Sequence, residues 1–191
     1  MVMSLEELSA REEIRQVIYR HFRAGDRIDA DMDRTACWDD AMFIGGPVDV
    51  PMSEAIPLIY DTMMRTYFKV TNHYMTNIII EVDGETAAAE VYAVAYHVLP
   101  TDREALTAVL GKARLDALGD AAEQTHELTL GIRYSMRLEQ RGEVWKIAAQ
   151  KLIMDWSKLA PYTGIEGGGV YDFLTLRGTR DRTDPSYEWL R

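Results

Sequence analysis

Cysteine is almost absent from this sequence, since Cys37 is the only one among 191 residues. An internal disulfide is therefore excluded, which is typical of proteins that stay in a reducing compartment. Apolar runs are also short, and none approaches the roughly 20 residues that a membrane-spanning helix needs. The chain opens with MVMSLEELSAREE, an acidic and polar segment that does not resemble a secretory signal. Together these features predict a cytoplasmic protein.

Positive charge is scarce as well. Lys and Arg number 21 against 31 Asp and Glu, which gives a formal net charge of −10. Phosphate binding needs a clustered positive field, and no long basic run is present. We therefore expect a small-molecule substrate, with neither nucleic acid nor a membrane among the partners.

Motifs that hold cofactors or metal ions are missing. The four histidines show no close spacing such as H-x-x-x-H, so a dedicated zinc or iron site is not predicted. The glycines of GIEGGG have no strand-then-helix context and no following lysine, which indicates a flexible turn and not a phosphate cradle. We expect no cofactor and no metal.

What the chain does contain is helical periodicity in its first part. Apolar residues recur at helical spacing from Leu5 to Phe22, with Gly25 as the predicted end. Ser4 with Glu7 fits a capping box, and Ser9 with Glu12 fits one equally well and would start a second segment. Asp26 then lies at the C-terminal end of this helix, where the macrodipole disfavours an anion, so its carboxylate needs a partner. Further helical segments are predicted within residues 31–40 and 53–70, on either side of a strand at 41–46.

Strand patterns follow in pairs. Asp83-Gly84-Glu85 is a tight-turn signal between two apolar segments, and Arg141-Gly142 separates two more, so each pair is predicted to form a hairpin. Residues 100–127 between the hairpins form a helical insertion, and residues 157–191 form a C-terminal arm over the surface or a neighbouring subunit. The whole is one domain, with its core at about 1–156.

Helices followed by antiparallel strands predict an α+β fold. We expect a cone-shaped, half-open barrel in which a curved, mostly antiparallel sheet wraps around the N-terminal helices. Such a cone encloses one deep apolar pocket, where a ligand should bind.

Strand parity nominates residues for that pocket, because alternate residues face opposite sides of a sheet. Between Thr86 and Leu99 the alternating alanines share a face with His97, and they either line a cavity or receive a packed helix. On the last strand, alternation from Trp145 places Lys151 among the apolar residues of one face, where it either packs through its stem or pairs with a buried acid.

His73 stands in TNHYMTN, directly before the most apolar run of the chain. A partly buried neutral imidazole can accept a proton near neutral pH, and a carboxylate on its other nitrogen fixes the tautomer. A lone histidine in this position is more often a structural hydrogen-bonding group. Nothing in the sequence by itself places Asp26 beside it.

Three segments carry a family resemblance, in this order and spacing: REEIRQVIYRHFRAGDRIDADMDRTACWDDAMF, TNHYMTN and YSMRLEQRGEVWKIAAQKL. They resemble the SnoaL-like branch of the nuclear transport factor two-like superfamily. Within it the comparison is nearest to the hexachlorocyclohexane dehydrochlorinases and more distant to the scytalone dehydratases. The resemblance implies that His73 and Asp26 form a dyad for cofactor-free proton abstraction, with Trp38 near the pocket wall. Gln150 stands where the dehydrochlorinases have an arginine.

The resulting hypothesis is a cofactor-independent lyase that acts on a small apolar, aromatic or cyclic substrate by dehydration, dehydrohalogenation or deformylation. His73 and Asp26 are the candidate catalytic residues. The alternatives are an isomerase or polyketide-cyclase-type enzyme with an aspartate base, and a non-catalytic subunit such as the beta subunit of ring-hydroxylating dioxygenases. A homo-oligomer, trimer or dimer, is expected because apolar residues remain on the outer sheet face. The candidate substrate-binding residues are Tyr19, Phe22, Trp38, Tyr60, Tyr96, His97 and Lys151.

Overall fold

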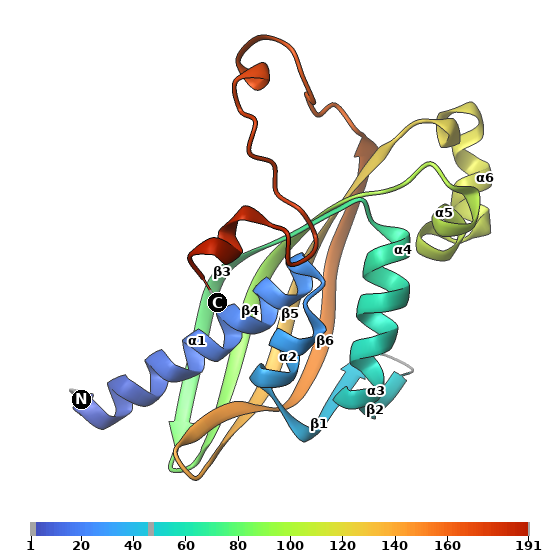
Figure 1. Ribbon diagram of the computed structural model, residues 1–191. Helices are drawn as coiled ribbons and strands as arrows, with labels where there is room; N and C mark the ends of the chain where they lie inside the picture. The colour runs from blue at the N-terminus through green and yellow to red at the C-terminus, as the bar shows by residue number, and fades with distance from the viewer. Residues whose placement is uncertain (1–2, 46–47, 191) are drawn as a thin grey trace.

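A computed structural model describes residues 3–45 and 48–190 and has helices on one side of a long curved sheet (Figure 1). The six strands lie in the order β2-β1-β6-β5-β4-β3, and every neighbouring pair is antiparallel except β1 and β6. The strands are β1 (Cys37–Gly45), β2 (Val48–Pro51), β3 (Val70–Asp83), β4 (Thr86–Val98), β5 (His126–Arg141) and β6 (Val144–Pro161). This is the predicted α+β fold, and the sheet remains open as expected.

Three groups of helices precede the C-terminal arm, and two short 3-10 helices (Gly169–Asp172 and Pro185–Glu188) lie within it. The N-terminal pair is α1 (Leu5–Arg27) and α2 (Ala30–Ala36). A continuous helical stretch follows β2 and consists of α3 (Met52–Pro57), a π-helical segment (Leu58–Met64) and α4 (Arg65–Tyr67). The insertion between β4 and β5 holds α5 (Arg103–Leu110), α6 (Lys112–Leu118) and a 3-10 turn (Gly119–Glu123). None of the helices in the described part of the chain is long and apolar enough to cross a membrane.

The first helix begins as predicted and ends later than predicted. The Ser4 side chain accepts the Glu7 N–H at 3.1 Å, as an N-cap should. At the other end Gly25 does not stop the helix, which runs on to Arg27 and closes at Ile28 in the left-handed conformation with φ 50°. The Asp29 N–H then bonds the Ala24 carbonyl at 2.9 Å, and this bond holds Ile28 in a conformation that costs roughly 1–2 kcal/mol. Gly25 instead faces open space, because a side chain there would meet no atom within 4 Å.

A β-bulge changes which residues of β6 face inward. Leu138 of β5 pairs with Ile147, whereas Arg137 pairs with Ala149, so Ala148 is an extra residue on β6. Beyond it the parity reverses: Gln150 is buried and Lys151 is exposed. Simple alternation had placed Lys151 on the inner face, and that assignment is wrong for this reason.

The alanines of β4 belong to the packed interior. Ala87, Ala89, Ala93 and Ala95 share one hydrophobic cluster with Ile14, Ile18 and Phe22 of α1. All four are at most 5% exposed and none lines a cavity, so this face packs in the hydrophobic core. A smaller cluster, formed by Leu99, Leu106, Leu115, Ala122 and Leu128, supports the helical insertion.

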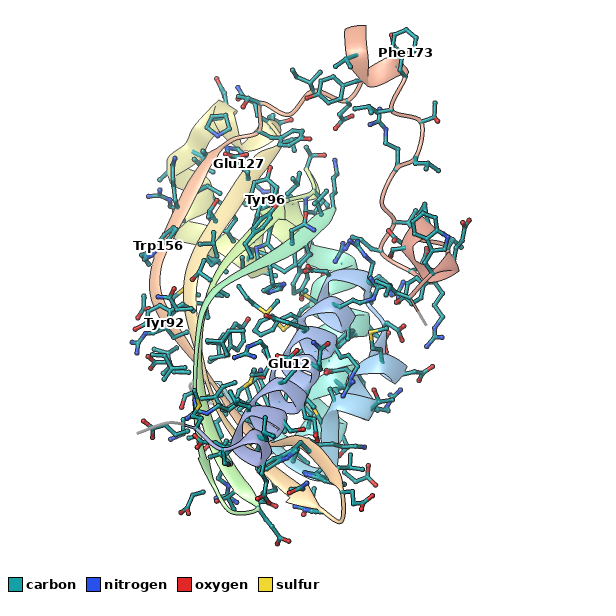
Figure 2. All side chains as sticks on the ribbon, turned by 90° about the vertical axis from the view of Figure 1, so that its left-hand side faces the viewer. Glu12, Tyr92, Tyr96, Glu127, Trp156 and Phe173 are labelled. Carbon is teal, nitrogen blue, oxygen red and sulfur yellow. The ribbon has the colours of Figure 1, made fainter. Side chains whose placement is uncertain are left out.

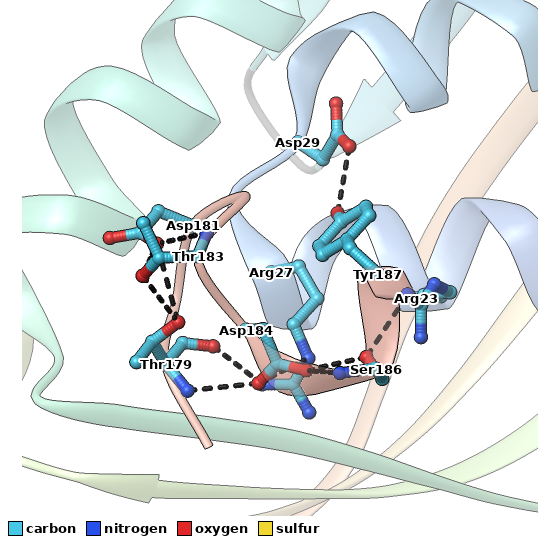
Figure 3. Close-up of polar contacts among 9 residues, drawn as sticks. All are labelled: Arg23, Arg27, Asp29, Thr179, Asp181, Thr183, Asp184, Ser186 and Tyr187. Carbon is cyan, nitrogen blue, oxygen red and sulfur yellow. Dashed lines mark hydrogen bonds and ion pairs between the residues drawn. The ribbon is translucent and has the colours of Figure 1, made fainter. Parts of the chain in front are cut away.

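The C-terminal arm leaves the sheet after Pro161, projects away from it and returns to the end of α1 (Figure 1). On the return, Arg27 donates to the Thr179 carbonyl at 3.0 Å, and the Tyr187 hydroxyl donates to Asp29 at 2.7 Å. Arg23 donates to Ser186 at 3.1 Å in the same network (Figure 3). The end of the arm is therefore fixed to the junction of α1 and α2.

Candidate active site

A cavity of about 360 Å³ lies between the helices and the inner face of the sheet. Its walls come from α1, α2, the helical stretch 52–67 and all six strands, which means that the whole cone contributes to it. Most of the lining side chains are apolar. The polar members of the lining are His21, Asp33, Tyr60, His73, His97, Tyr134 and Gln150.

His73 and Asp26 lie in direct contact at the edge of this cavity. The Nδ1 atom of His73 is 2.7 Å from Oδ1 of Asp26, and the backbone N–H of His73 donates to Oδ2 at 3.0 Å. Both side chains are largely buried, with exposed fractions of 9% and 15%. Because the carboxylate can only accept, Nδ1–H of His73 donates to Asp26, and Nε2 is the ring nitrogen that remains outside this pair.

The last turn of α1 is an unfavourable place for the Asp26 carboxylate, because the helix macrodipole is negative there. Two N–H donors of His73 compensate for this and also fix the carboxylate in its orientation. The Phe22 ring, with its centroid 5.5 Å from that of His73, borders the imidazole. The two hydrogen bonds and the Phe22 ring therefore fix the orientation of both His73 and Asp26 without a ligand.

His97 stands beside this pair on β4. Its ring centroid is 6.0 Å from that of His73, in an edge-to-face arrangement, and 4.3 Å from that of Phe68. Burial, and secondly the charge of the neighbouring His73, lower the pKa of His97 to about 4. His97 is consequently a neutral imidazole at neutral pH.

A second histidine–carboxylate pair lines the same cavity. Nδ1 of His21 is 2.6 Å from Oδ1 of Asp33, and the Tyr60 hydroxyl donates to Oδ2 at 2.9 Å. Burial acts to lower the pKa of His21, but the charge and hydrogen bond of Asp33 outweigh it, so the pKa is raised well above its usual value. Burial and the Asp33 charge raise the pKa of Tyr60 well above its usual value, which keeps its hydroxyl protonated as a donor.

A family model described as a SnoaL-like domain matches residues 6–151. The chain belongs to the SnoaL-like family. Its fold is similar to that of a protein of Salmonella enterica described as a nuclear transport factor 2-like superfamily protein, with a TM-score of 0.59, 18% identity, and coverage of 84% of this chain and 98% of that one. None of the curated proteins compared matches the sequence.

Two further structures resemble this SnoaL-like protein. The type-3 hexachlorocyclohexane dehydrochlorinase of Novosphingobium barchaimii aligns with a TM-score of 0.64 and 17% identity, over 86% of this chain and 98% of that chain. A protein described as a scytalone dehydratase of Novosphingobium aromaticivorans aligns with a TM-score of 0.61 and 14% identity, over 83% and 91%. At these identities the likeness shows the fold.

The structure of the SnoaL-like protein brings some of the sequence-predicted residues to the cavity. Phe22, Tyr60 and His97 line it together with His73. Asp26 is outside the lining and contacts the cavity residue His73.

Four predicted binding residues lie elsewhere. Tyr19 is on the exposed side of α1, and the Tyr96 hydroxyl donates to Glu127 at 3.0 Å. Trp38 donates its indole N–H to the Glu139 carbonyl at 3.0 Å, outside the cavity lining. Lys151 faces solvent because of the bulge at Ala148.

Sequence reasoning missed Asp33 and Tyr134 and passed over Gln150 as a pocket residue. A signal for Asp33 existed, because His21 falls on the buried stripe of α1 and a histidine there needs a polar partner. Strand alternation gave no signal for Gln150, since the bulge turns it inward, and only its match to the arginine of the dehydrochlorinases pointed to it.

Proposed function

We propose that this SnoaL-like protein is a cofactor-independent lyase in which His73 removes a proton from carbon and Asp26 orients it and stabilises the imidazolium. One observation supports this most: Asp26 binds both N–H groups of His73, at 2.7 and 3.0 Å, and leaves Nε2 as the basic atom at the cavity. A base held in this way needs no reorganisation before it accepts a proton.

The reaction is an elimination. Nε2 of His73 takes a proton from a carbon atom, the C–H electrons form a double bond, and the leaving group departs from the adjacent carbon with its bonding pair. The mostly apolar lining favours a small aromatic or cyclic substrate. Similar folds are described as a dehydrochlorinase and a scytalone dehydratase, which supports an elimination without fixing the leaving group.

Proton abstraction can be measured with 4-phenoxybutan-2-one, hexachlorocyclohexane and scytalone as probes, by product release and by hydrogen–deuterium exchange at carbon in D₂O. We expect His73→Asn and Asp26→Asn each to lower kcat/KM or the exchange rate by about 10²–10⁴-fold in a folded protein, the usual contribution of a general base. Tyr19→Phe, on the exposed side of α1, is the matched control. Wild-type rates in either dyad variant contradict the proposal.

The alternative with Asp26 as the base receives less support, because His73 stands between that carboxylate and the cavity. In that case His73→Gln would keep its turnover and only the Asp26 variant would lose it. A purely structural subunit is disfavoured by the cavity itself, which side chains do not fill.

We also propose that the protein forms a homo-oligomer through the outer face of the sheet.

A further inference from the structure

We propose that His21, held by Asp33 and Tyr60, is a second catalytic group of the same cavity and protonates a leaving group that departs through oxygen. This inference rests on the proposed lyase function. It adds a general acid that complements the general base His73. It also assigns a substrate class, because hydroxide, alkoxide and phenoxide are basic leaving groups that need a proton in order to leave, whereas chloride does not.

The first argument is the saturation of Asp33. Its side chain is 2% exposed, with one carboxylate oxygen on His21 Nδ1 at 2.6 Å and the other on the Tyr60 hydroxyl at 2.9 Å. A buried carboxylate without a counter-charge is very costly, and no lysine or arginine is paired with Asp33 among the ion pairs of the described chain. Of the groups that contact it, His21, Tyr60 and Cys37, only the His21 imidazole can carry a positive charge.

The second argument is the remaining nitrogen of His21. Since Nδ1–H is committed to Asp33, Nε2 is the atom through which His21 reaches a ligand in the cavity that it lines. Asp33 from α2 holds Nδ1, and the Phe22 ring packs edge-to-face on the His21 ring with centroids 5.4 Å apart. Cys37 from β1 and Tyr60 from the π-helical segment contact Asp33. Tyr60 and Asp33 are positioning residues, because they act through His21.

The third argument is the contrast between the two histidine–carboxylate pairs. Asp26 receives a backbone N–H in addition to the His73 ring, so its charge is compensated even when His73 is neutral. Among the described residues no backbone N–H donates to the Asp33 side chain, which is 2% exposed, so its negative charge is balanced only when His21 is protonated. The two pairs thus differ in their donors, and this difference assigns the base to His73 and the acid to His21, the arrangement that general acid–base catalysis requires.

The complete step balances without a co-reactant. The carbon-bound proton moves to Nε2 of His73, the C–H electrons form the double bond, the C–O bond breaks, and the departing oxygen takes the proton from Nε2 of His21. The products are an alkene and water, an alcohol or a phenol. His73 then carries one extra proton and His21 lacks one, and exchange with water after product release restores both.

His21, Asp33 and Cys37 could also hold a metal ion, since one ligand atom from each lies within 4.8 Å of the others. Two ligands of a tetrahedral zinc ion lie about 3.3 Å apart when each is about 2 Å from the metal. The separation of 2.6 Å between Nδ1 and Oδ1 is shorter than this and is that of a shared proton. Metal binding is therefore an outcome for the experiment to exclude.

The decisive experiment compares two probes with the same carbon acid, 4-phenoxybutan-2-one and 4-(4-nitrophenoxy)butan-2-one. Nitrophenoxide leaves without acid assistance, whereas phenoxide needs it. We expect His21→Asn, whose amide can still donate to Asp33, to lower kcat for the phenoxy probe by about 10²–10³-fold and for the nitrophenoxy probe by less than about 3-fold. His73→Asn should lower both rates, and Tyr19→Phe, on the exposed side of α1, should lower neither.

The outcomes separate the two proposals. Equal losses for both probes in His21→Asn, or no loss for either, overturn the role of His21 and leave His73 as the base. Unchanged rates in His73→Asn overturn the lyase proposal itself. Where the wild type turns over neither probe, binding of 4-nitrophenol at pH 7 decides: we expect the wild type to bind the phenolate form and His21→Asn to bind it at least 10-fold more weakly.

Equal binding of the phenolate by His21→Asn, or no phenolate bound by the wild type, overturns the inference, because a protonated His21 should attract an aryloxide. The last measurement adds Zn²⁺ alone to the protein. We expect the histidine NMR signals of His21 to remain unchanged at micromolar Zn²⁺, and their loss would instead assign the cluster to a metal ion.

Discussion

His97 is a histidine that the protein keeps uncharged, and its ionisation gives a residue-scale prediction. In an unfolded chain the imidazole has a pKa near 6.5, whereas burial and the nearby His73 lower the pKa of His97 in the folded protein to about 4. Between these two values the unfolded state binds more protons, so stability is lost as the pH falls below about 6.5 and the loss levels off below about 4. The shift corresponds to roughly 3 kcal/mol of unfolding free energy at most.

The measurement is denaturant unfolding between pH 7.5 and 4 for the wild type and His97→Phe. Phenylalanine keeps a ring against Phe68 but cannot be protonated, so we expect the variant to lose about 1–3 kcal/mol less than the wild type over this range. The difference between the two proteins isolates His97 from the carboxylates, which titrate in both. Parallel pH profiles would show that His97 accepts a proton without penalty and is not the neutral group of the cavity.

At the scale of elements, much of the fold could be predicted from local patterns. The cap at Ser4, the two hairpins and the helical insertion follow from signals that lie within a few residues of each other, and the strand face ending in His97 follows from simple alternation. Gly84 and Gly142, at φ 58° and 66°, show why the hairpin turns were readable. Such features are local in sequence, and one chain is enough to show them.

The features that could not be predicted are those decided by tertiary contacts. Ile28 ends α1 because the chain must turn there, although a β-branched residue is a poor choice for that conformation. The bulge at Ala148 has no marker in the sequence. It reverses the alternation of β6, so that Gln150 and not Lys151 faces the cavity. Asp26 and His73 are 47 positions apart, so only the family resemblance suggested that they meet.

The C-terminal arm lies beyond residues 6–151, which the family model matches, and its returning part gives a prediction. Arg180 donates to the carbonyls of Met64 and Phe68, at the end of the helical stretch that walls the cavity. Burial, and secondly the charge of Arg65, lower the pKa of Arg180 to about 10, which leaves it charged at neutral pH. The arm therefore caps a helix whose last carbonyls have no partner within the helix.

We expect Arg180→Ala to lower the unfolding free energy by about 1–3 kcal/mol, the usual cost of leaving buried polar groups unpaired. For a chain of this size this corresponds to a lower Tm by roughly 3–10 °C in a calorimetric or circular-dichroism melt. Arg177→Ala is the matched control, because Arg177 is exposed and bonds only the Tyr171 carbonyl within the arm. A Tm equal to that of the wild type would mean that the arm rests on the helix without supporting it.

At the scale of the whole molecule, the two faces of the sheet have different environments. The inner face holds the core and the cavity, whereas Tyr92 and Trp156 lie on the side away from the helices (Figure 2). The exposed fraction is 50% for Trp156 and 51% for Met154, and the Trp156 ring covers Gly131 on the neighbouring strand. Arg133, paired with Glu90 and Asp155, adds a polar border to these apolar groups.

An apolar surface with a charged border is typical of a protein interface, and tryptophan and tyrosine are the residues that contribute most there. If the proposed homo-oligomer forms through this face, Trp156→Lys buries a charge at the interface and should dissociate the oligomer. Sedimentation velocity at micromolar concentration should then show the monomer of 21.8 kDa. Val144→Lys is the control: Val144 is as exposed as Trp156 but lies at the opposite end of β6. A monomeric wild type contradicts the oligomer proposal, and an oligomer that survives Trp156→Lys excludes this face, since a lysine ammonium cannot be desolvated there without a partner.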